Sequence, residues 1–218
     1  MKADVRLYLV TGPVGRGNRL EHVVEEAIRG GVTMIQIRDK RATDDELLAS
    51  TRRIQAIAGP AGVAVIINDN VAVAKCAGAS GVHVGTSDSA PKAARRELGV
   101  AASIGWSIND LSQIDAVDAV AASDYLAASP VWPTRSKTDT THPFGLDGVR
   151  ALRRRMPPNL SLVAIGGIGP ANAYDVIAAG ADGIAVVSAI CAAPDPFRSA
   201  SELRAIVDEA LGARGSLS

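Results

Sequence analysis

Short runs of apolar, mostly β-branched residues alternate with longer segments of helical character along most of the chain. The apolar runs are nearly continuous and do not alternate with polar residues, which is typical of parallel strands buried on both faces. Each run is followed by helical periodicity or by a helix-start signal. We therefore predict eight strands, over residues 5–10, 33–37, 63–67, 81–84, 101–104, 124–128, 160–165 and 184–187.

Helix-start signals separate these runs. Thr43 is followed three residues later by Glu46, and Asn18 by Glu21, which is the spacing of a capping box. Proline at the first helical position and Asn at the cap are further start signals. They predict four more starts, at Pro91, Asn109, Pro170 and Pro196.

A short motif recurs where a predicted helix passes into a predicted strand. Residues 77–82 (Ala-Gly-Ala-Ser-Gly-Val) and 179–184 (Ala-Gly-Ala-Asp-Gly-Ile) have the same form, and residues 30–32 partly repeat it. Eight strand–helix units with this repetition favour a closed barrel over an open doubly wound sheet. We expect an α/β fold, with a single-domain (β/α)₈ TIM barrel over residues 1–211 and a flexible tail over residues 212–218.

The composition argues against several classes of partner. The 23 basic and 23 acidic residues balance, so no net field attracts nucleic acid or an acidic membrane. No apolar run is long enough to span a bilayer, and residues 1–10 carry charges that a signal peptide core lacks. Cys76 and Cys191 are isolated, and we interpret both as reduced, small core residues of a cytoplasmic protein. We expect small-molecule substrates, and a homo-oligomer is compatible with the sequence.

The carboxyl end of the second predicted strand carries the sequence Gln36-Ile37-Arg38-Asp39-Lys40. In a barrel of this kind the active site lies at the carboxyl ends of the strands. Alternation places Gln36, Arg38 and Lys40 on one side, toward the barrel mouth. An amide and two cations suit a polyanionic ligand. The alternative is a surface edge of ion pairs, which the position of Gln36 within an apolar strand disfavours.

The next two strand ends carry carboxylates. Asn68 and Asp69 follow the third strand, and Asp88 follows the fourth, so the two carboxylates are expected within reach of one ion. Oxygen ligands beside a phosphate-rich substrate suit Mg²⁺, although each residue could instead only cap a helix. The histidines have no zinc-ligand spacing, and we interpret His83 as a hydrogen-bonded core residue.

The remaining strand ends offer hydroxyls, cations and glycines. Ser107 follows the fifth strand as a site hydroxyl or a simple cap. The loop 130–138 (Pro-Val-Trp-Pro-Thr-Arg-Ser-Lys-Thr) combines hydroxyls with Arg135 and Lys137, which can grip phosphate oxygens. Glycines at 166, 167 and 169, with residues 186–190, follow the last two strands, where this fold commonly binds phosphate. Surface loops and tight turns are the alternatives.

Taken in order, these segments resemble the thiamine-phosphate synthase family. The matching segments are residues 7–11, 36–40, 67–69, 81–85 with Asp88, 130–134 with Lys137, 164–168 and 186–190. Each is short, but the ordered set over nearly the whole chain is specific. The resemblance implies a TIM-barrel transferase that joins 4-amino-2-methyl-5-(diphosphooxymethyl)pyrimidine to 4-methyl-5-(2-phosphoethyl)thiazole. Diphosphate leaves first, and the thiazole nitrogen then attacks to give thiamine phosphate.

The resemblance also implies residue roles. The pyrimidine diphosphate would be held by Gln36, Arg38, Lys40, Asn68, Ser107 and Lys137. Ile37 and Asp39 of the same segment join the substrate-binding set, and the catalytic group would be Arg38, Lys40, Ser107 and Lys137. Asp69 and Asp88 would hold Mg²⁺. The thiazole phosphate would be held by Thr134, Arg135, Ser136, Gly167, Val187 and Ser188.

The chain departs from the family's usual residues at Gly12, Thr86, Trp106, Ser129 and Arg135. Thr86 and Trp106 are expected to border the pyrimidine site and to influence substrate preference. Two alternatives stay open. A thiazole tautomerase paralogue would share the barrel and the thiazole-phosphate site, with His142 as a proton-transfer candidate, but would not need the carboxylate pair. A non-catalytic thiamine-precursor binding protein would keep the ligand contacts without turnover.

Overall fold

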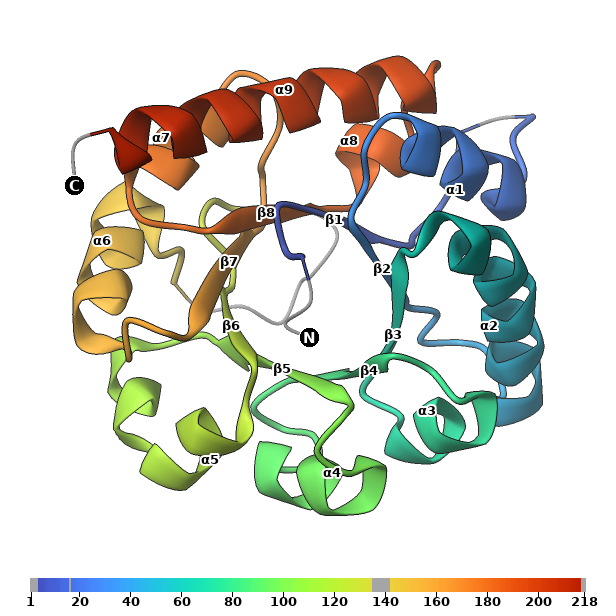
Figure 1. The fold of residues 1–218 in the computed structure, drawn as a ribbon, viewed down its shortest axis with the longest axis horizontal. Coiled ribbons are helices and arrows are strands. Elements are labelled where there is room, and N and C mark those ends of the chain that lie inside the picture. The colour runs from blue at the N-terminus through green and yellow to red at the C-terminus, as the bar shows by residue number, and fades with distance from the viewer. Residues whose placement is uncertain (1–3, 16, 135–141, 217–218) are drawn as a thin grey trace.

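The computed structural model describes residues 4–15, 17–134 and 142–216. Eight parallel strands form a closed barrel in which each strand pairs with the next and the last pairs with the first (Figure 1). This confirms the predicted (β/α)₈ barrel. The strands are β1 Leu7–Val10, β2 Met34–Ile37, β3 Ala64–Asn68, β4 Gly81–Val84, β5 Ser103–Ile108, β6 Tyr125–Ala128, β7 Ser161–Ile165 and β8 Gly183–Val186.

Helices surround the barrel, and the long α9 lies across α7, α8 and α1 (Figure 1). Within the described ranges, none of these helices is both long and apolar enough to cross a membrane. The helices are α1 Leu20–Arg29, α2 Asp44–Ala58, α3 Val71–Ala77, α4 Pro91–Leu98, α5 Val117–Ala122, α6 Gly145–Arg155, α7 Ala173–Ala178, α8 Ser188–Cys191 and α9 Pro196–Gly215, with short 3₁₀ helices η1 Gly59–Ala61 and η2 Leu111–Asp115.

The predicted helix starts have mixed outcomes. The capping box of Thr43 and Glu46 is confirmed, with backbone-to-side-chain bonds in both directions. Both starts predicted at asparagines are wrong: α1 begins at Leu20 without a side-chain cap from Asn18, and Asp110, one residue after the predicted cap, caps η2. Pro91 and Pro196 do begin α4 and α9, whereas Pro170 lies in a turn before α7.

The carboxyl end of the chain is more ordered than its glycines predict. Helix α9 continues to Gly215, through most of the expected tail. The guanidinium of Arg214 explains this, because it donates to the carbonyl of Ala181 at 2.7 Å and to Asp182 at 2.6 Å. Residues 217–218 lie outside the described part of the chain.

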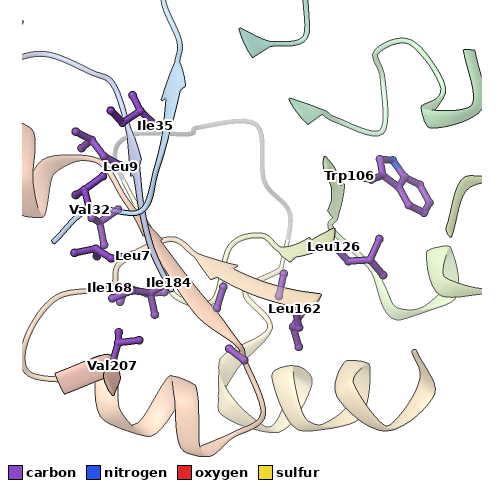
Figure 2. Packing of buried hydrophobic residues seen from close by; sticks show 14 of the residues in the cluster. Leu7, Leu9, Val32, Ile35, Trp106, Leu126, Leu162, Ile168, Ile184 and Val207 are labelled. Atoms are coloured by element: carbon purple, nitrogen blue, oxygen red, sulfur yellow. The ribbon is translucent and has the colours of Figure 1, made fainter. Parts of the chain in front are cut away.

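Strand alternation divides the buried residues into two layers. Leu7 and Leu9 of β1 point outward and pack between barrel and helices (Figure 2). Tyr8 and Val10 point into the barrel. Cys191 is buried in the outer layer as expected. The expectation for Cys76 is wrong: its thiol is exposed, because it lies on the face of α3 opposite the residues that pack inward.

The amino ends of the strands are tied in pairs by one repeated arrangement, which we call the strand-pair clamp. The residue just before each even-numbered strand donates its backbone N–H to a carbonyl near the start of the preceding strand, at 2.7–2.9 Å. Its side chain accepts the N–H of the same partner residue at 2.7–3.2 Å. The clamp residues and their partners are Thr33 with Leu7, Ser80 with Val65, Asp124 with Ile104, and Asp182 with Leu162.

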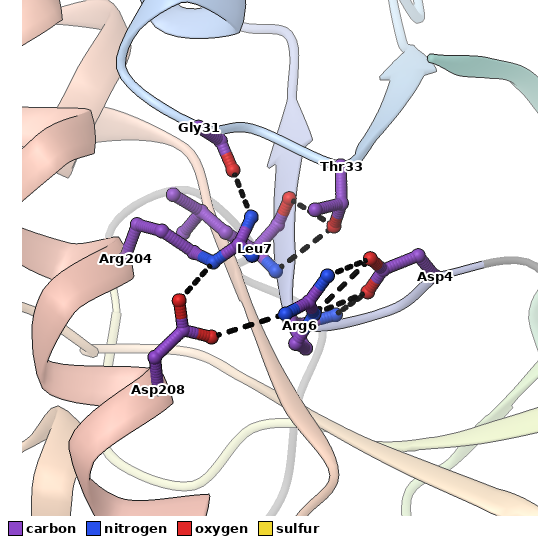
Figure 3. A network of polar contacts seen from close by, with 7 residues as sticks. All are labelled: Asp4, Arg6, Leu7, Gly31, Thr33, Arg204 and Asp208. Carbon is purple, nitrogen blue, oxygen red and sulfur yellow. Dashed lines mark hydrogen bonds and ion pairs between the residues drawn. The ribbon is translucent and has the colours of Figure 1, made fainter. Parts of the chain in front are cut away.

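These clamps give a physical reason for the recurring sequence motif, whose polar position is the clamp residue. Arginines on the surrounding helices reinforce them. Arg95 bonds Asp124, and Arg153 bonds Asp182. Beside the first clamp, Arg204 donates to the carbonyl of Gly31 at 2.9 Å within a larger ionic network (Figure 3). This end of the barrel therefore contributes to stability, as is usual for the amino-terminal face of the fold.

Candidate active site

A cavity of about 770 Å³ lies at the carboxyl ends of the strands. All eight strands contribute to its lining, together with the loops that follow them. The floor is apolar on one side, where Ala127, Val163 and Ala185 of β6, β7 and β8 face inward, and polar on the other. The cavity can therefore enclose a flat ring while its mouth meets charged groups.

Two cations converge on this cavity from the end of β2. Gln36, Arg38 and Lys40 all line it, as the alternation predicts. Within the described ranges neither cation takes part in an ion pair, so both charges are available to an anion. The intervening residues do not line the cavity: Ile37 packs in the outer core, and Asp39 is exposed, with its carboxylate accepting the N–H of Arg41.

The end of β2 is held in place by Thr11, which follows β1. The buried Thr11 hydroxyl accepts the backbone N–H of Arg38 at 2.8 Å. The Thr11 N–H donates to the carbonyl of Gln36 at 2.9 Å. Two bonds thus fix the backbone on either side of Ile37, at the point where β2 ends and the cationic side chains begin.

The predicted carboxylate pair is brought together at the ends of β3 and β4. Asp69 has a positive φ of 61°, and its Oδ2 accepts a bond from the amide of Asn68 at 2.5 Å. Asp88 accepts the N–H of Gly85 at 2.8 Å. Burial, and then the hydrogen bond and negative charge of Asp88, raise the pKa of Asp69 from 3.8 to about 6.

The raised pKa determines how Asp69 affects stability. Because the folded-state pKa lies above the unperturbed 3.8, folding favours the protonated carboxyl. Its stabilising contribution is complete below about pH 3.8 and is lost as the pH rises through about 6. At neutral pH the site therefore holds an unfavourable negative charge that a bound cation would relieve.

The donor set at this pair fits a hard divalent cation. The available donors are carboxylate oxygens beside the Asn68 amide, and oxygen ligands are those that Mg²⁺ prefers. The part of the chain that the structure describes gathers no cluster of three or more His, Cys, Asp or Glu side chains. Asp69 and Asp88 would thus supply two protein ligands and leave the other positions to substrate oxygens and water.

Ser107 lines the cavity from β5, and the neighbouring Trp106 does not. The indole of Trp106 packs in the outer layer, on the opposite face of the strand (Figure 2). The expectation that Trp106 borders the pyrimidine site is therefore wrong, because adjacent residues of a strand point to opposite sides. Thr86, the other unusual residue, does line the cavity.

The loops after β6 and β7 are packed tightly against each other. The N–H of Val131 donates to the carbonyl of Ile165 at 2.8 Å. Gly166 and Gly167 have positive φ, and a Cβ on Gly166 would lie 2.6 Å from the Cβ of Pro130. Thr134 lines the cavity, whereas the predicted site residues Arg135, Ser136 and Lys137 lie outside the described residues.

Two neighbouring strands supply the remaining predicted residues. Gly167 follows β7, and Val187 and Ser188 follow β8; all three line the cavity. Ser188 begins the short helix α8, which sequence periodicity missed because four residues are too few to show it.

Comparison with known proteins agrees with this geometry. A family model described as thiamine monophosphate synthase matches residues 7–190. The chain belongs to this family. It is 45% identical over 205 residues to the thiamine-phosphate synthase of Albidiferax ferrireducens, covering 94% of this chain and 92% of that protein. It is 44% identical over 206 residues to that of Chloroflexus aurantiacus, covering 94% and 93%.

A solved structure supports the thiamine monophosphate synthase fold directly. The thiamine phosphate pyrophosphorylase from Pyrococcus furiosus superimposes with a TM-score of 0.84 at 33% identity, covering 97% of this chain and 99% of that one. The fold and the family are therefore established over nearly the whole chain.

Sequence reasoning missed three residues that shape this family member's site. Thr11 positions β2, and Tyr8 and Tyr125 place their hydroxyls inside the barrel, where they bond each other at 3.0 Å. A signal was present for the tyrosines, since a phenol inside a fully buried strand requires a buried hydrogen-bond partner. His83 is buried and hydrogen-bonded at both ring nitrogens, which confirms its interpretation, and it also lines the cavity.

Proposed function

We propose that this protein is a transferase that couples the pyrimidine diphosphate to the thiazole phosphate, giving thiamine phosphate and pyrophosphate. The observation that carries this is the meeting of Arg38 and Lys40 with the carboxylates Asp69 and Asp88 at one cavity mouth. Cations and a cation-binding carboxylate pair are what the departure of a diphosphate requires. The names of the relatives point to the same reaction.

The protein's main contribution to the first step is electrostatic. As the carbon–oxygen bond breaks, negative charge grows on the departing diphosphate, and Arg38 and Lys40 are positioned to stabilise it without reorganising. We assign the same role to Lys137, and Gln36, Asn68 and Ser107 to holding the pyrimidine portion. The thiazole nitrogen already carries a lone pair, so its attack requires no general base.

The apolar part of the cavity protects the reactive carbon. A pyrimidine that has lost its diphosphate is a carbocation that water would trap. The apolar side chains of Ala127, Val163 and Ala185 form that part of the floor and offer water no hydrogen bonds. We assign the thiazole phosphate to the loops that follow the same three strands, at Thr134, Gly167, Val187 and Ser188, and we add Arg135 and Ser136 of the sequence after Thr134 to this assignment.

We further propose Mg²⁺ as the cation of the Asp69–Asp88 pair. When bound, it would supply positive charge to the diphosphate oxygens and lower the cost of their departure. Both cysteines are free thiols, which fits the cytoplasmic location that we propose.

A coupling assay tests the function. Purified protein is incubated with both phosphorylated substrates, in Mg²⁺ or in EDTA, and thiamine phosphate is measured. We expect metal-dependent product. Lys40→Ala should lower kcat/KM by about 10²–10³, the usual effect of removing a preorganised charge contact. Arg41→Ala is the matched control, because Arg41 is exposed and does not line the cavity.

The outcomes separate the candidates. Absence of product while the thiazole phosphate still binds would refute the synthase and favour a tautomerase or a binding protein. Full activity in EDTA would refute only the metal assignment. Equal loss in Lys40→Ala and Arg41→Ala would show that the cation at position 40 has no specific role.

A further inference from the structure

Five polar side chains form one continuous hydrogen-bonded chain across the barrel interior, which we call the barrel relay. The amide nitrogen of Gln36 bonds the hydroxyl of Tyr8 at 2.7 Å, and that hydroxyl bonds Tyr125 at 3.0 Å. The Tyr125 hydroxyl bonds Nδ1 of His83 at 3.1 Å, and Nε2 of His83 bonds the hydroxyl of Ser107 at 2.9 Å. The relay joins β2, β1, β6, β4 and β5, and both of its ends line the cavity.

The chemistry of the groups sets the direction of every bond in the relay. An amide nitrogen only donates, so the Tyr8 hydroxyl accepts from Gln36. Tyr8 has one proton, and leaving it unbonded in the interior would be costly, so it donates to Tyr125. The single proton of Tyr125 then goes to Nδ1 of His83. That nitrogen must carry a lone pair, so the imidazole proton is on Nε2 and is donated to Ser107.

Packing holds the relay in this arrangement. The rings of His83 and Tyr125 stack with centroids 5.6 Å apart, and Tyr8 meets Tyr125 edge-on at 6.0 Å. Gly105 leaves the space for this stack, because any Cβ there would collide with the Tyr125 ring and with His83 Nδ1. Burial raises the pKa of both phenols above the ordinary value, so both remain proton donors across the physiological range.

We propose that Tyr8, Tyr125 and His83 are positioning residues that present the Ser107 hydroxyl to the substrate as a hydrogen-bond donor. Because Ser107 accepts from His83, its own proton is turned toward the cavity. With its proton turned this way, the Ser107 hydroxyl favours a substrate that presents a hydrogen-bond acceptor there, such as a ring nitrogen. It disfavours a substrate that presents an N–H or a C–H at the same place. This inference rests on the proposed function, in which Ser107 meets the pyrimidine.

Nitrogen NMR of the unliganded protein tests the direction of the relay independently of turnover. In protein labelled at histidine nitrogens, we expect a pyridine-like Nδ1 and a protonated Nε2 for His83. A double variant, His22→Gln with His142→Gln, assigns the signal, since both of those histidines are exposed. A protonated Nδ1 in the wild type would overturn the proposal even if coupling activity is normal.

Two matched tyrosine variants test whether the Tyr125 hydroxyl fixes the tautomer of His83. Tyr125→Phe removes the proton that fixes His83, so we expect a mixture of imidazole tautomers. The KM for the pyrimidine diphosphate should rise about tenfold, the equivalent of one hydrogen bond, while that for the thiazole phosphate is unchanged. Tyr8→Phe keeps the bond from Tyr125 to His83, so the tautomer should be retained. Equal tautomer shifts in both variants would refute the relay, and if Tyr125→Phe does not fold, the wild-type spectrum decides.

Discussion

Replacing Asp182 with alanine should lower the stability of the protein without lowering its turnover rate. Asp182 precedes β8, at the end of the barrel opposite the cavity. Its Oδ2 accepts the N–H of Leu162 at 2.9 Å and a bond from Arg153 at 3.0 Å, and its Oδ1 accepts a bond from Arg214 at 2.6 Å. Alanine would remove all three bonds and leave the buried N–H without its side-chain partner.

The expected magnitude follows from these contacts. A backbone N–H bonded to a carboxylate contributes about 1.5–3 kcal/mol net. The two ion pairs are partly exposed, so each adds only about 0–1 kcal/mol. The free energy of unfolding should therefore fall by roughly 2–4 kcal/mol in total. In a domain of this size the Tm falls by about 2–4 °C per kcal/mol, so a decrease of roughly 5–15 °C is expected.

Thermal unfolding and a coupling assay at 25 °C measure the two effects separately. Ser80→Ala is the matched control, because Ser80 holds the same place in its clamp through a neutral hydroxyl and should cost only about 0.5–1.5 kcal/mol. Two results would contradict the reasoning. One is an equal loss of stability in both variants, and the other is a large loss of kcat in Asp182→Ala at a temperature where it is folded.

Three further predictions concern the cavity and its walls. Asp69→Asn should abolish coupling yet raise the Tm of the metal-free protein at pH 7–8, with the gain disappearing below pH 4, where both forms are neutral; an unchanged Tm at pH 8 would contradict the raised pKa. Gly166→Ala should destabilise the protein and raise the KM for the thiazole phosphate, whereas Gly212→Ala in α9, with open space around its Cβ position and no positive φ, should do neither; equal effects would refute the loop packing. Trp106→Phe should lower stability by roughly 1–3 kcal/mol, as reduced core packing does, and leave the KM for the pyrimidine diphosphate unchanged; a changed KM would place the indole in the site.

Much of the architecture could be predicted because parallel buried strands leave a strong signal. The predicted limits of β4 and the predicted start of α4 match the structure residue for residue. Strand β5 was predicted too short, since Gly105 and Ser107 interrupt its apolar run while both face the barrel interior. Local composition therefore predicts strands whose inward-facing residues are apolar. It shortens a strand such as β5, whose inward-facing residues are small or polar.

The site was predictable where charge marks a strand end and unpredictable where hydroxyls act from within a strand. Arg38, Lys40 and the two carboxylates stand out because they are charged groups that closely follow apolar strand runs in the sequence. Tyr8 and Tyr125 count as apolar in a pattern search, although their hydroxyls form the middle of the relay. Trp106 is next to Ser107 in sequence, but strand alternation turns its indole away from the cavity.

The strand-pair clamps divide the barrel into four tied strand pairs: β1 with β2, β3 with β4, β5 with β6, and β7 with β8. At three of the four boundaries between these pairs, the residues before β3, β5 and β7 are Val63, Ala102 and Leu160. Their side chains cannot accept a backbone N–H. Local opening should therefore begin at the boundaries between strand pairs. Amide hydrogen exchange at the strand starts should be faster at these boundaries than within a pair. The barrel relay links three of the four strand pairs from inside, so the buried hydroxyls of Tyr8 and Tyr125 also hold the pairs together against such opening.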